Sequence, residues 1–414
     1  MTVRPNGEID LPASMSVVRR RHQKSYLRQA FEIVRLVLGP WKLSPWDYYR
    51  YRLYDDERYN WAQRHQFIGD NSCGWIRHSV SDASSRDILD DKLNAAGELR
   101  RHGLPAPELR AFFHPSRNAR GIVTLRSAAE LADHLRSRME YPFFFKPACS
   151  LKGRGAGLAV SYDAASDSIS MIDGEQVAVA EFARRIEEFC LFEPSRTSFE
   201  PRAGYLFQEV VQQHPAIVEI CGPAVCSLRI YAGVDDRGAS LFEIVWKIAA
   251  PGNATDNFGP PGNIVAAIDH DTGEVLRASR GLGTDREELE VNPNTGRRVV
   301  GFQLPFFEEL RRLVLKGAVL FPKLRFQGWD VAIGPDGPVI IEVNNSSGFR
   351  LGQVASGNGL CTPEFTEFLS RAKRLNSARP FRLPIAWKSP YAIWRIYGVW
   401  KLLASFFRRP PSSQ

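Results

Sequence analysis

The stretch from Gly328 to Gly348, GWDVAIGPDGPVIIEVNNSSG, constrains the fold more than any other part of the sequence. Two short apolar runs flank a Pro-Asp-Gly turn, which is typical of a β-hairpin. Asp330, Glu342 and Asn344 nevertheless lie inside the apolar runs. Side chains two residues apart on a strand share a face, with Cα atoms about 6.6 Å apart, so we expect Glu342 and Asn344 to project to the same side.

Two interpretations of these three polar residues are open. Mg²⁺ takes oxygen ligands at about 2.0 to 2.1 Å, and a Glu and an Asn opposed by an Asp on the neighbouring strand have the reach and the chemistry for one or two ions. Alternatively, the three side chains form the solvent-facing side of the hairpin, which is the usual place for alternating polar residues. Taken alone, the hairpin favours the solvent-facing interpretation.

Composition and charge narrow the class of protein. The 414-residue chain is 44% hydrophobic, enough for two or three compact units. No apolar run of 18 residues is present and the N-terminus lacks a signal-peptide core, so we expect a cytoplasmic protein that does not span a membrane. The spacing of the six cysteines indicates neither zinc nor disulfides. A net charge of +8 suits a polyanionic partner, but without a nucleic-acid-binding motif we expect no nucleic acid.

The order of the expected elements predicts an α+β protein with five regions. Residues 1 to about 20 are expected to be disordered, and Tyr26 to Leu38 forms an amphipathic helix. A second helix ends at Gly103, because two prolines follow it. The regions are a helical N-terminal extension (1–85), the first part of the core (86–140), a lid of short strands (141–212), a larger sheet domain (213–375) and a basic amphipathic tail (376–414).

The tail has a helical period from Tyr391 to Arg409, with basic residues on one arc and tryptophans among the apolar remainder. Such a helix either docks onto its own domain or lies on a membrane surface. Docking is favoured, because most amphipathic helices face a core. The alternative predicts peripheral contact with the inner face of a membrane.

A glycine-rich loop follows Lys146 in KPACSLKGRGAGLAV, with Gly153, Gly155 and Gly157 before the next strand. Backbone N–H groups beside glycines approach phosphate oxygens closely, and a nearby ammonium group neutralises them. A flexible turn is the alternative interpretation. The loop is not a P-loop, since no G-x-x-x-x-G-K-[ST] is present.

Two further cations, Arg229 and Lys247, lie inside apolar strands. A buried cation is costly unless it meets an anion, so each predicts an anionic partner. Structural ion pairs with the hairpin acids and a catalytic role are equally open for both residues.

In this order, the motifs resemble the ATP-grasp superfamily, and within it the sugar-transfer associated branch. The series runs from a helix lysine through a strand lysine, the glycine loop, QEVV, a strand arginine, a strand lysine and DNF to the hairpin, and it covers about Trp46 to Ser370. The resemblance implies an ATP-grasp fold with two α+β subdomains that clamp ATP, preceded by the helical extension and followed by the amphipathic helix.

The resemblance also implies roles for individual residues. Relatives commonly have an arginine where Lys247 stands and a Gly-Gly after DNF, where this chain has GPPG. The implied nucleotide-binding residues are Lys92 and Lys146 for the phosphates, Ser150, Gly153, Gly155 and Gly157 for the flap, and Gln208, Glu209 and Val211 for adenine. The resemblance implies catalytic roles for Arg229 and Lys247. It implies that Asp330, Glu342 and Asn344 bind two magnesium ions. The residues expected to contact the acceptor substrate are Asn257, Ser346, Ser347 and Arg350.

For Ser346, Ser347 and Arg350, a helix cap followed by a surface arginine is a nearly equal alternative. The implied reaction is an ADP-forming, ATP- and Mg²⁺-dependent carboxylate ligation through an acyl phosphate. Its partners are a small-molecule or glycan-precursor carboxylate and a nucleophile, in cell-surface polysaccharide biosynthesis. A kinase of a small molecule or sugar, and a non-catalytic nucleotide-binding partner of a glycosyltransferase system, are the alternatives.

Overall fold

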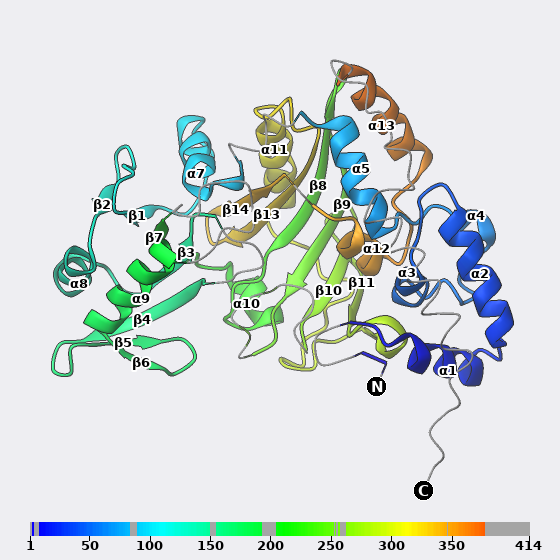
Figure 1. Ribbon diagram of the computed structural model, residues 1–414, viewed down its shortest axis with the longest axis horizontal. Coiled ribbons are helices and arrows are strands. Elements are labelled where there is room, and N and C mark those ends of the chain that lie inside the picture. Colours follow the sequence, from blue (N-terminus) through cyan, green and yellow to red (C-terminus); the bar gives the residue numbers. More distant parts are fainter. Residues whose placement is uncertain are drawn as a thin grey trace, which may run out of the picture.

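Two seven-stranded sheets and a helical N-terminal unit make up the chain in the computed structural model (Figure 1). Within the described part of the chain, no helix is both long enough and apolar enough to cross a bilayer. The helix expected from Tyr391 to Arg409 lies outside that part. The structure describes residues 2–3, 8–82, 89–149, 155–192, 204–251, 253, 256, 262–345 and 347–376.

The first sheet has the strand order β2-β1-β7-β3-β4-β5-β6 and is covered by α8 and α9. Alternate residues such as Phe143, Phe145 and Phe207 enter the core under these helices, as the two-residue period of a strand requires. The bounds are β1 Leu109–Phe113, β2 Val123–Leu125, α8 Ala128–Ser137, β3 Phe143–Pro147, β4 Gly157–Asp163, β5 Ser168–Met171, β6 Gln176–Ala178, α9 Val179–Phe192 and β7 Tyr205–Glu209.

The short strands expected within residues 141–212 are present as β3, β4, β5, β6 and β7, and α9 lies between β6 and β7. The sequence did not indicate β1, β2 or α8. Strands from residues 86–140 and from residues 141–212 join the same sheet, because β1 pairs with β7. The boundary at residue 140 stays a prediction.

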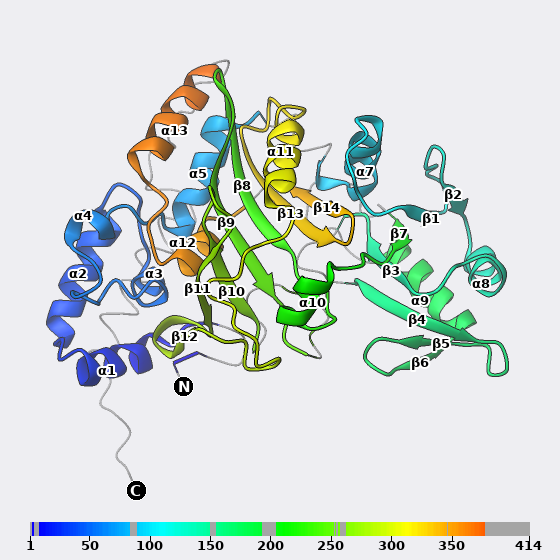
Figure 2. The same cartoon turned by 180° about the vertical axis from the view of Figure 1, so that it is seen from behind.

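The second sheet has the order β12-β11-β10-β9-β8-β13-β14. One face packs on α11, while α12, α13 and the N-terminal helices cover the other (Figures 1 and 2). The bounds are α10 Pro215–Cys221, β8 Leu228–Asp235, β9 Gly238–Ile248, β10 Ile264–Ile268, β11 Val275–Arg280, η2 Gly283–Asp285, β12 Glu287–Leu289, α11 Phe307–Ala318, β13 Phe326–Gly334, β14 Gly337–Asn344, α12 Arg350–Ser356 and α13 Pro363–Leu375.

The predicted hairpin is β13 and β14, and its antiparallel register places Asp330 opposite Glu342. On β8 and β13, Ile230 and Trp329 belong to the core under α11. The neighbouring Arg229 and Asp330 therefore project from the opposite face, since successive side chains alternate. The Asp330 carboxylate thus lies on the face of the second sheet that the N-terminal helices and α12 cover.

The N-terminal unit is helical, as predicted, but the disorder expected for residues 1 to about 20 is wrong for Leu11 and the residues after it, and residues 1 and 4–7 lie outside the described part of the chain. Helix α1 begins after Asp10, whose side chain accepts a hydrogen bond from Ala13 N at 3.0 Å. Its apolar side buries Met15 and Val18. The bounds are α1 Leu11–Arg21, α2 Tyr26–Leu38, α3 Pro45–Arg50, α4 Trp61–Arg64, α5 Asp70–Val80 and, next to the first sheet, α7 Lys92–Arg101.

Candidate functional site

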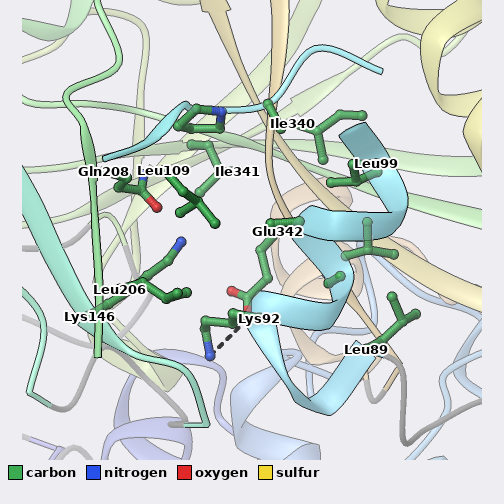
Figure 3. A pocket seen from close by; sticks show the side chains of 15 residues that line it. Leu89, Lys92, Leu99, Leu109, Lys146, Leu206, Gln208, Ile340, Ile341 and Glu342 are labelled. Atoms are coloured by element: carbon green, nitrogen blue, oxygen red, sulfur yellow. Dashed lines mark ion pairs between the residues drawn. The ribbon is translucent and has the colours of Figure 1, made fainter. Parts of the chain in front are cut away.

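A pocket lies between the two sheets and has an empty volume of about 440 Å³, part of it open to solvent. Strands β1, β3 and β7 of the first sheet line one side of the pocket, and β14 and the neighbouring helix α7 line the other (Figure 3). A mostly apolar pocket with a few convergent polar groups is the usual form of a small-molecule site. The lining residues are Leu89, Lys92, Ala95, Ala96, Leu99, Ala106, Pro107, Leu109, Lys146, Leu206, Gln208, Ile340, Ile341, Glu342 and Val343.

Lys92 enters the pocket from the first residue of α7. The carboxylate of Asp91 caps this helix by accepting a hydrogen bond from Leu93 N at 2.9 Å, which fixes where the helix begins. The backbone N–H of Lys92 donates to Ala148 O at 2.9 Å and ties the helix to the end of β3. Its Nζ lies 3.4 Å from Glu342 Oε1, so a cation of α7 pairs with an anion of the neighbouring strand β14 (Figure 3).

Lys146 enters the same pocket from β3, where it pairs with Leu206 of β7. Burial lowers the pKa of its ammonium group to about 8, with the charge of Lys92 acting in the same direction and the Glu342 carboxylate opposing it. Two lysines and one glutamate give the described lining of this pocket a net positive charge. The charge distribution therefore favours a polyanion.

Asp330 is the centre of a second, more buried charge cluster on β8, β9 and β13. Arg229 donates to both carboxylate oxygens, from Nε at 2.7 Å and from Nη2 at 2.8 Å. Lys247 Nζ lies 3.2 Å from Oδ1 of Asp330 and 3.3 Å from Oδ1 of Asp256. The predicted anionic partners of both strand cations are thus present.

Charge balance sets the protonation of this cluster. Burial raises the pKa of Asp330, but Arg229 and Lys247 more than offset it and hold this pKa well below its usual range. Burial lowers the pKa of Lys247, and the two aspartates bring it above its ordinary value. All three groups are therefore charged at neutral pH. Removing one partner from such a set costs about 3 to 5 kcal/mol.

The three predicted magnesium ligands differ in how many of their oxygens are engaged. Their donor set consists of hard oxygen atoms and fits Mg²⁺. Glu342 contacts Lys92 at its Oε1, and Asn344 donates its Nδ2 to Asp330 Oδ2 at 3.1 Å, which leaves the Asn344 amide oxygen for another partner. Asp330 already has two protein contacts on each oxygen. Glu342 and Asn344 thus fit the ion directly, whereas Asp330 must exchange a protein contact to bind it.

Among the described residues, no group of three or more His, Cys, Asp and Glu is placed to hold a metal ion. Asp330 and Glu342 alone are too few carboxylates for such a group, and the amide of Asn344 completes the predicted set. The three residues are cross-strand and same-strand neighbours in the hairpin. The arrangement suits Mg²⁺, which keeps several waters and takes only one or two carboxylates from the protein.

The predicted flap and hinge residues are placed in part. Gly157 starts β4 against the ring of Phe145, and a Cβ there would lie 2.5 Å from that ring. Gly155 has a φ of +75°, in the left-handed region that glycine tolerates, and its carbonyl accepts a hydrogen bond from Tyr205 at 2.9 Å. Ser150 and Gly153 lie outside the described residues.

At the hinge, Gln208 lines the pocket. The carboxylate of Glu209 accepts a hydrogen bond from Glu108 N at 2.9 Å, so it holds β7 against the chain segment before β1. Val211 follows β7 and is half-buried. Neither Glu209 nor Val211 is among the described residues that line the pocket, and their adenine contacts stay predictions.

The predicted acceptor residues follow β14. Ser347 is buried over Gly328, and its hydroxyl has no hydrogen-bond partner among the described residues. Arg350 opens α12 and forms an ion pair with Asp70 of α5. Asn257 and Ser346 lie outside the described residues. The N-terminal unit therefore contacts the segment for which acceptor binding was predicted, and the acceptor contacts themselves stay predictions.

Sequence reasoning missed two carboxylates of this region. Asp256 accepts hydrogen bonds from the backbone and the hydroxyl of Ser227, at 2.7 and 2.5 Å, in addition to its pairing with Lys247. Asp90 accepts a hydrogen bond from Asn345, directly after the hairpin. Asp256 could have been found, because a cation in a strand predicts an acid and Asp256 is the first residue of the DNF motif.

The two sheets, the lysines between them and the acidic hairpin define the class of ATP-grasp proteins. The chain belongs to the sugar-transfer associated ATP-grasp family, whose model matches residues 77–367 and thus more than half of the chain. No curated protein matches its sequence significantly.

Solved structures with a similar arrangement are remote. The VanG D-Ala:D-Ser ligase from Enterococcus faecalis is 13% identical, with a TM-score of 0.40 over 71% of this chain and 64% of that chain. The biotin carboxylase domain of 2-oxoglutarate carboxylase from Hydrogenobacter thermophilus, in complex with MgADP, ADP and bicarbonate, is 12% identical. Its TM-score is 0.40, over 77% and 54% of the two chains. This chain thus spans about half to two thirds of the length of these proteins.

Proposed function

We propose that the protein is an ATP- and Mg²⁺-dependent ligase that activates a carboxylate as an acyl phosphate and forms ADP. One observation carries the proposal: Lys92 and Lys146 enter a mostly apolar pocket and face Glu342 of the acidic hairpin. The apolar wall suits a nucleotide base, and the lysines suit its phosphates.

The residues of the chain account for most of what phosphoryl transfer requires. Lys92 and Lys146 neutralise phosphate oxygens, and Arg229 and Lys247 are pre-oriented by Asp330 for the charge that develops on the transferred group. Glu342 and Asn344, with Asp330 after it exchanges a contact, would hold Mg²⁺. A bound Mg²⁺ neutralises charge between the β- and γ-phosphates. No protein nucleophile is needed, because positioning and electrostatics dominate this reaction.

The proposed chemistry has two steps. A carboxylate oxygen of the substrate attacks the γ-phosphorus of ATP, the bond to the β-phosphate oxygen breaks and ADP leaves. An amine or another nucleophile then attacks the acyl carbon, phosphate leaves and the nucleophile loses a proton. The acceptor end, next to Ser347 and Arg350, is where we place the carboxylate and the nucleophile. A carboxylate of a glycan precursor agrees with the description of the family.

The test is a screen of candidate carboxylates and amines with the full-length protein, MgATP and mass detection of the products. ADP together with a condensed product supports the ligase. ADP with a phosphorylated acceptor would assign a kinase instead, and AMP would contradict an acyl phosphate. A Glu342→Gln control identifies background ATPase activity, because turnover by the proposed site requires this carboxylate.

A further inference from the structure

Four arginines converge at the edge of the second sheet that lies farthest from the hairpin. Arg52 and Arg58 come from the loops around α3 and α4, Arg277 from β11, and Arg286 from the turn between η2 and β12; we call them the arginine cluster. Figure 2 shows β12 beside the N-terminal helices at this edge. The cluster is separate from the pocket, whose walls are α7, β1, β3, β7 and β14.

The positive charges of the arginine cluster are poorly compensated. Among the described residues, its ion pairs lead to a single acid, Glu288, which contacts Arg58 at 2.7 Å, Arg277 at 2.9 Å and Arg52 at 3.9 Å. Burial and the fields of Arg52 and Arg277 hold the pKa of the Arg286 guanidinium well below its ordinary value. Three positive charges remain after Glu288 is counted against the four arginines.

Arg286 is the most buried member, with 4% of its surface exposed. Its Nη1 donates to Val354 O at 3.2 Å, but its Nε and Nη2 have no hydrogen-bond partner in the described structure. The Nη1 of Arg58 is also buried and has no hydrogen-bond partner among the described residues. A buried guanidinium group with unused N–H donors is costly unless an anion joins it.

The carboxyl end of α12 explains only part of the arginine cluster. Arg277 donates to Ser356 O at 3.2 Å and Arg286 to Val354 O, so both contact carbonyl groups that a helix end leaves free. The partial negative charge of a helix end favours cations, but it amounts to only about half an elementary charge. The helix end thus leaves three donor nitrogens, Nε and Nη2 of Arg286 and Nη1 of Arg58, without a hydrogen-bond partner among the described residues. It also leaves most of the positive charge of the arginine cluster uncompensated.

We propose that the arginine cluster binds a phosphate group. A phosphate carries nearly two negative charges at neutral pH and offers three acceptor oxygens, which matches three unused N–H donors, and guanidinium forks fit it well. The side chains of Arg58 and Glu288 are 32% and 40% exposed, whereas those of Arg52 and Arg277 are 18% and 17% exposed. The phosphate thus enters beside Arg58 and Glu288, with Arg286 at the inner end.

The arginines that bind the phosphate would connect it to α12, the helix that follows β14, because Arg277 and Arg286 also donate to carbonyl groups of this helix. Helix α12 runs from Arg350, next to Asp70, to Ser356, next to Arg277. Free phosphate and the phosphate of a larger ligand, such as a sugar phosphate, share the chemistry that the cluster recognises. Either one would add an anion-dependent contact between the N-terminal unit, α12 and the second sheet.

Thermal unfolding of the full-length protein tests the site. At constant ionic strength, replacing chloride with inorganic phosphate, or adding glucose 1-phosphate, should raise the melting temperature by a few degrees. Arg286→Met should abolish the rise and, without phosphate, melt above the wild type, because it removes an uncompensated charge. Arg58→Gln, at the exposed side, should weaken phosphate binding at least tenfold in calorimetry and provides the test if Arg286→Met does not fold.

Two controls separate this site from others. Arg298→Gln removes the same charge from a side chain that is 69% exposed and paired with Glu290, and it should keep the full response. Lys146→Met should also keep the response of the arginine cluster, since Lys146 lies in the pocket between the sheets. A response to glucose 1-phosphate alone supports the site as part of a larger ligand site. The proposal would be overturned if phosphate raised the melting temperature of Arg286→Met and Arg58→Gln as much as that of the wild type. It would also be overturned if neither probe raised the melting temperature of the wild type.

Discussion

Two charge clusters of the candidate active site differ in their charge balance. Between the sheets, the charged side chains among the described residues that line the pocket are Lys92, Lys146 and Glu342, so positive charge is in excess along this lining. On the face of the second sheet, Arg229 and Lys247 are matched by Asp330 and Asp256. The balanced cluster is neutral without a ligand, whereas the described lining of the pocket carries an excess of positive charge that a polyanion would compensate.

This difference has opposite consequences for stability. In the balanced cluster every charge has a partner, so removing one leaves another charge buried and unpaired. In the pocket, Lys146 is already penalised by burial, as its lowered pKa shows. Substitutions in the two clusters should therefore change stability in opposite directions.

The largest effect is expected for Asp330→Asn. This change leaves Arg229 and Lys247 buried without their shared carboxylate, and we expect the free energy of unfolding to fall by about 3 to 5 kcal/mol in denaturant titrations. Asp336→Asn, at the exposed turn of the same hairpin, is the matched control and should change it by less than about 0.5 kcal/mol. A loss below 1 kcal/mol for Asp330→Asn would show that the cluster is not an obligatory scaffold.

Lys146→Met should stabilise the protein. The pKa of Lys146 falls from an ordinary 10.5 to about 8, which corresponds to a penalty of roughly 3 kcal/mol at neutral pH, and replacing the lysine relieves up to that amount. The same variant should bind ATP at least tenfold more weakly, because it lacks a charged phosphate contact. A destabilised variant, measured by the same denaturant titrations, would show that Lys146 contributes a structural interaction.

The gain from Lys146→Met should depend on pH. The folded state holds this proton less tightly than the unfolded state, so the penalty is complete below about pH 8 and fades as the pH rises toward 10.5. We expect the stability curves of the wild type and the variant to converge across this range. Curves that stay parallel from pH 7 to 10 would contradict the lowered pKa.

Glu342→Gln should have the smallest effect on stability, under about 1 kcal/mol, because the Glu342 side chain is 32% exposed and its pair with Lys92 is partly solvated. Magnesium-dependent ATP turnover should nevertheless be lost. Comparing Mg²⁺ titrations of turnover for the two proteins measures this effect. Retained turnover at an unchanged Mg²⁺ requirement would remove Glu342 from the metal site.

Much of the site could be predicted because its residues violate the local strand pattern. Charged or amide side chains such as Asp330, Glu342, Arg229 and Lys247 stand out in apolar strands, where burial demands a partner. The pairing of Asp330 with Glu342 followed from the hairpin turn.

Other features depend on contacts between distant segments. The segment that forms α1 was expected to be disordered, yet it is helical and packs against α3 and η2. The apolar pocket wall draws on residues of both sheets, and nothing in either segment indicates that they meet. Asp90 lies outside a strand, where a polar residue needs no explanation. The sequence pattern therefore indicates which buried side chains need partners. It indicates less readily which residues those partners are.

Calorimetry of nucleotide binding at pH 8 tests the central claim most directly. With a non-hydrolysable ATP analogue and Mg²⁺, repeated in buffers of different ionisation enthalpy, the wild type should take up about half a proton per nucleotide, because phosphate binding reprotonates Lys146 from a pKa of about 8. Lys146→Met should bind more weakly and take up none. Binding with the same affinity and proton uptake in both proteins would contradict the assignment of the pocket to ATP.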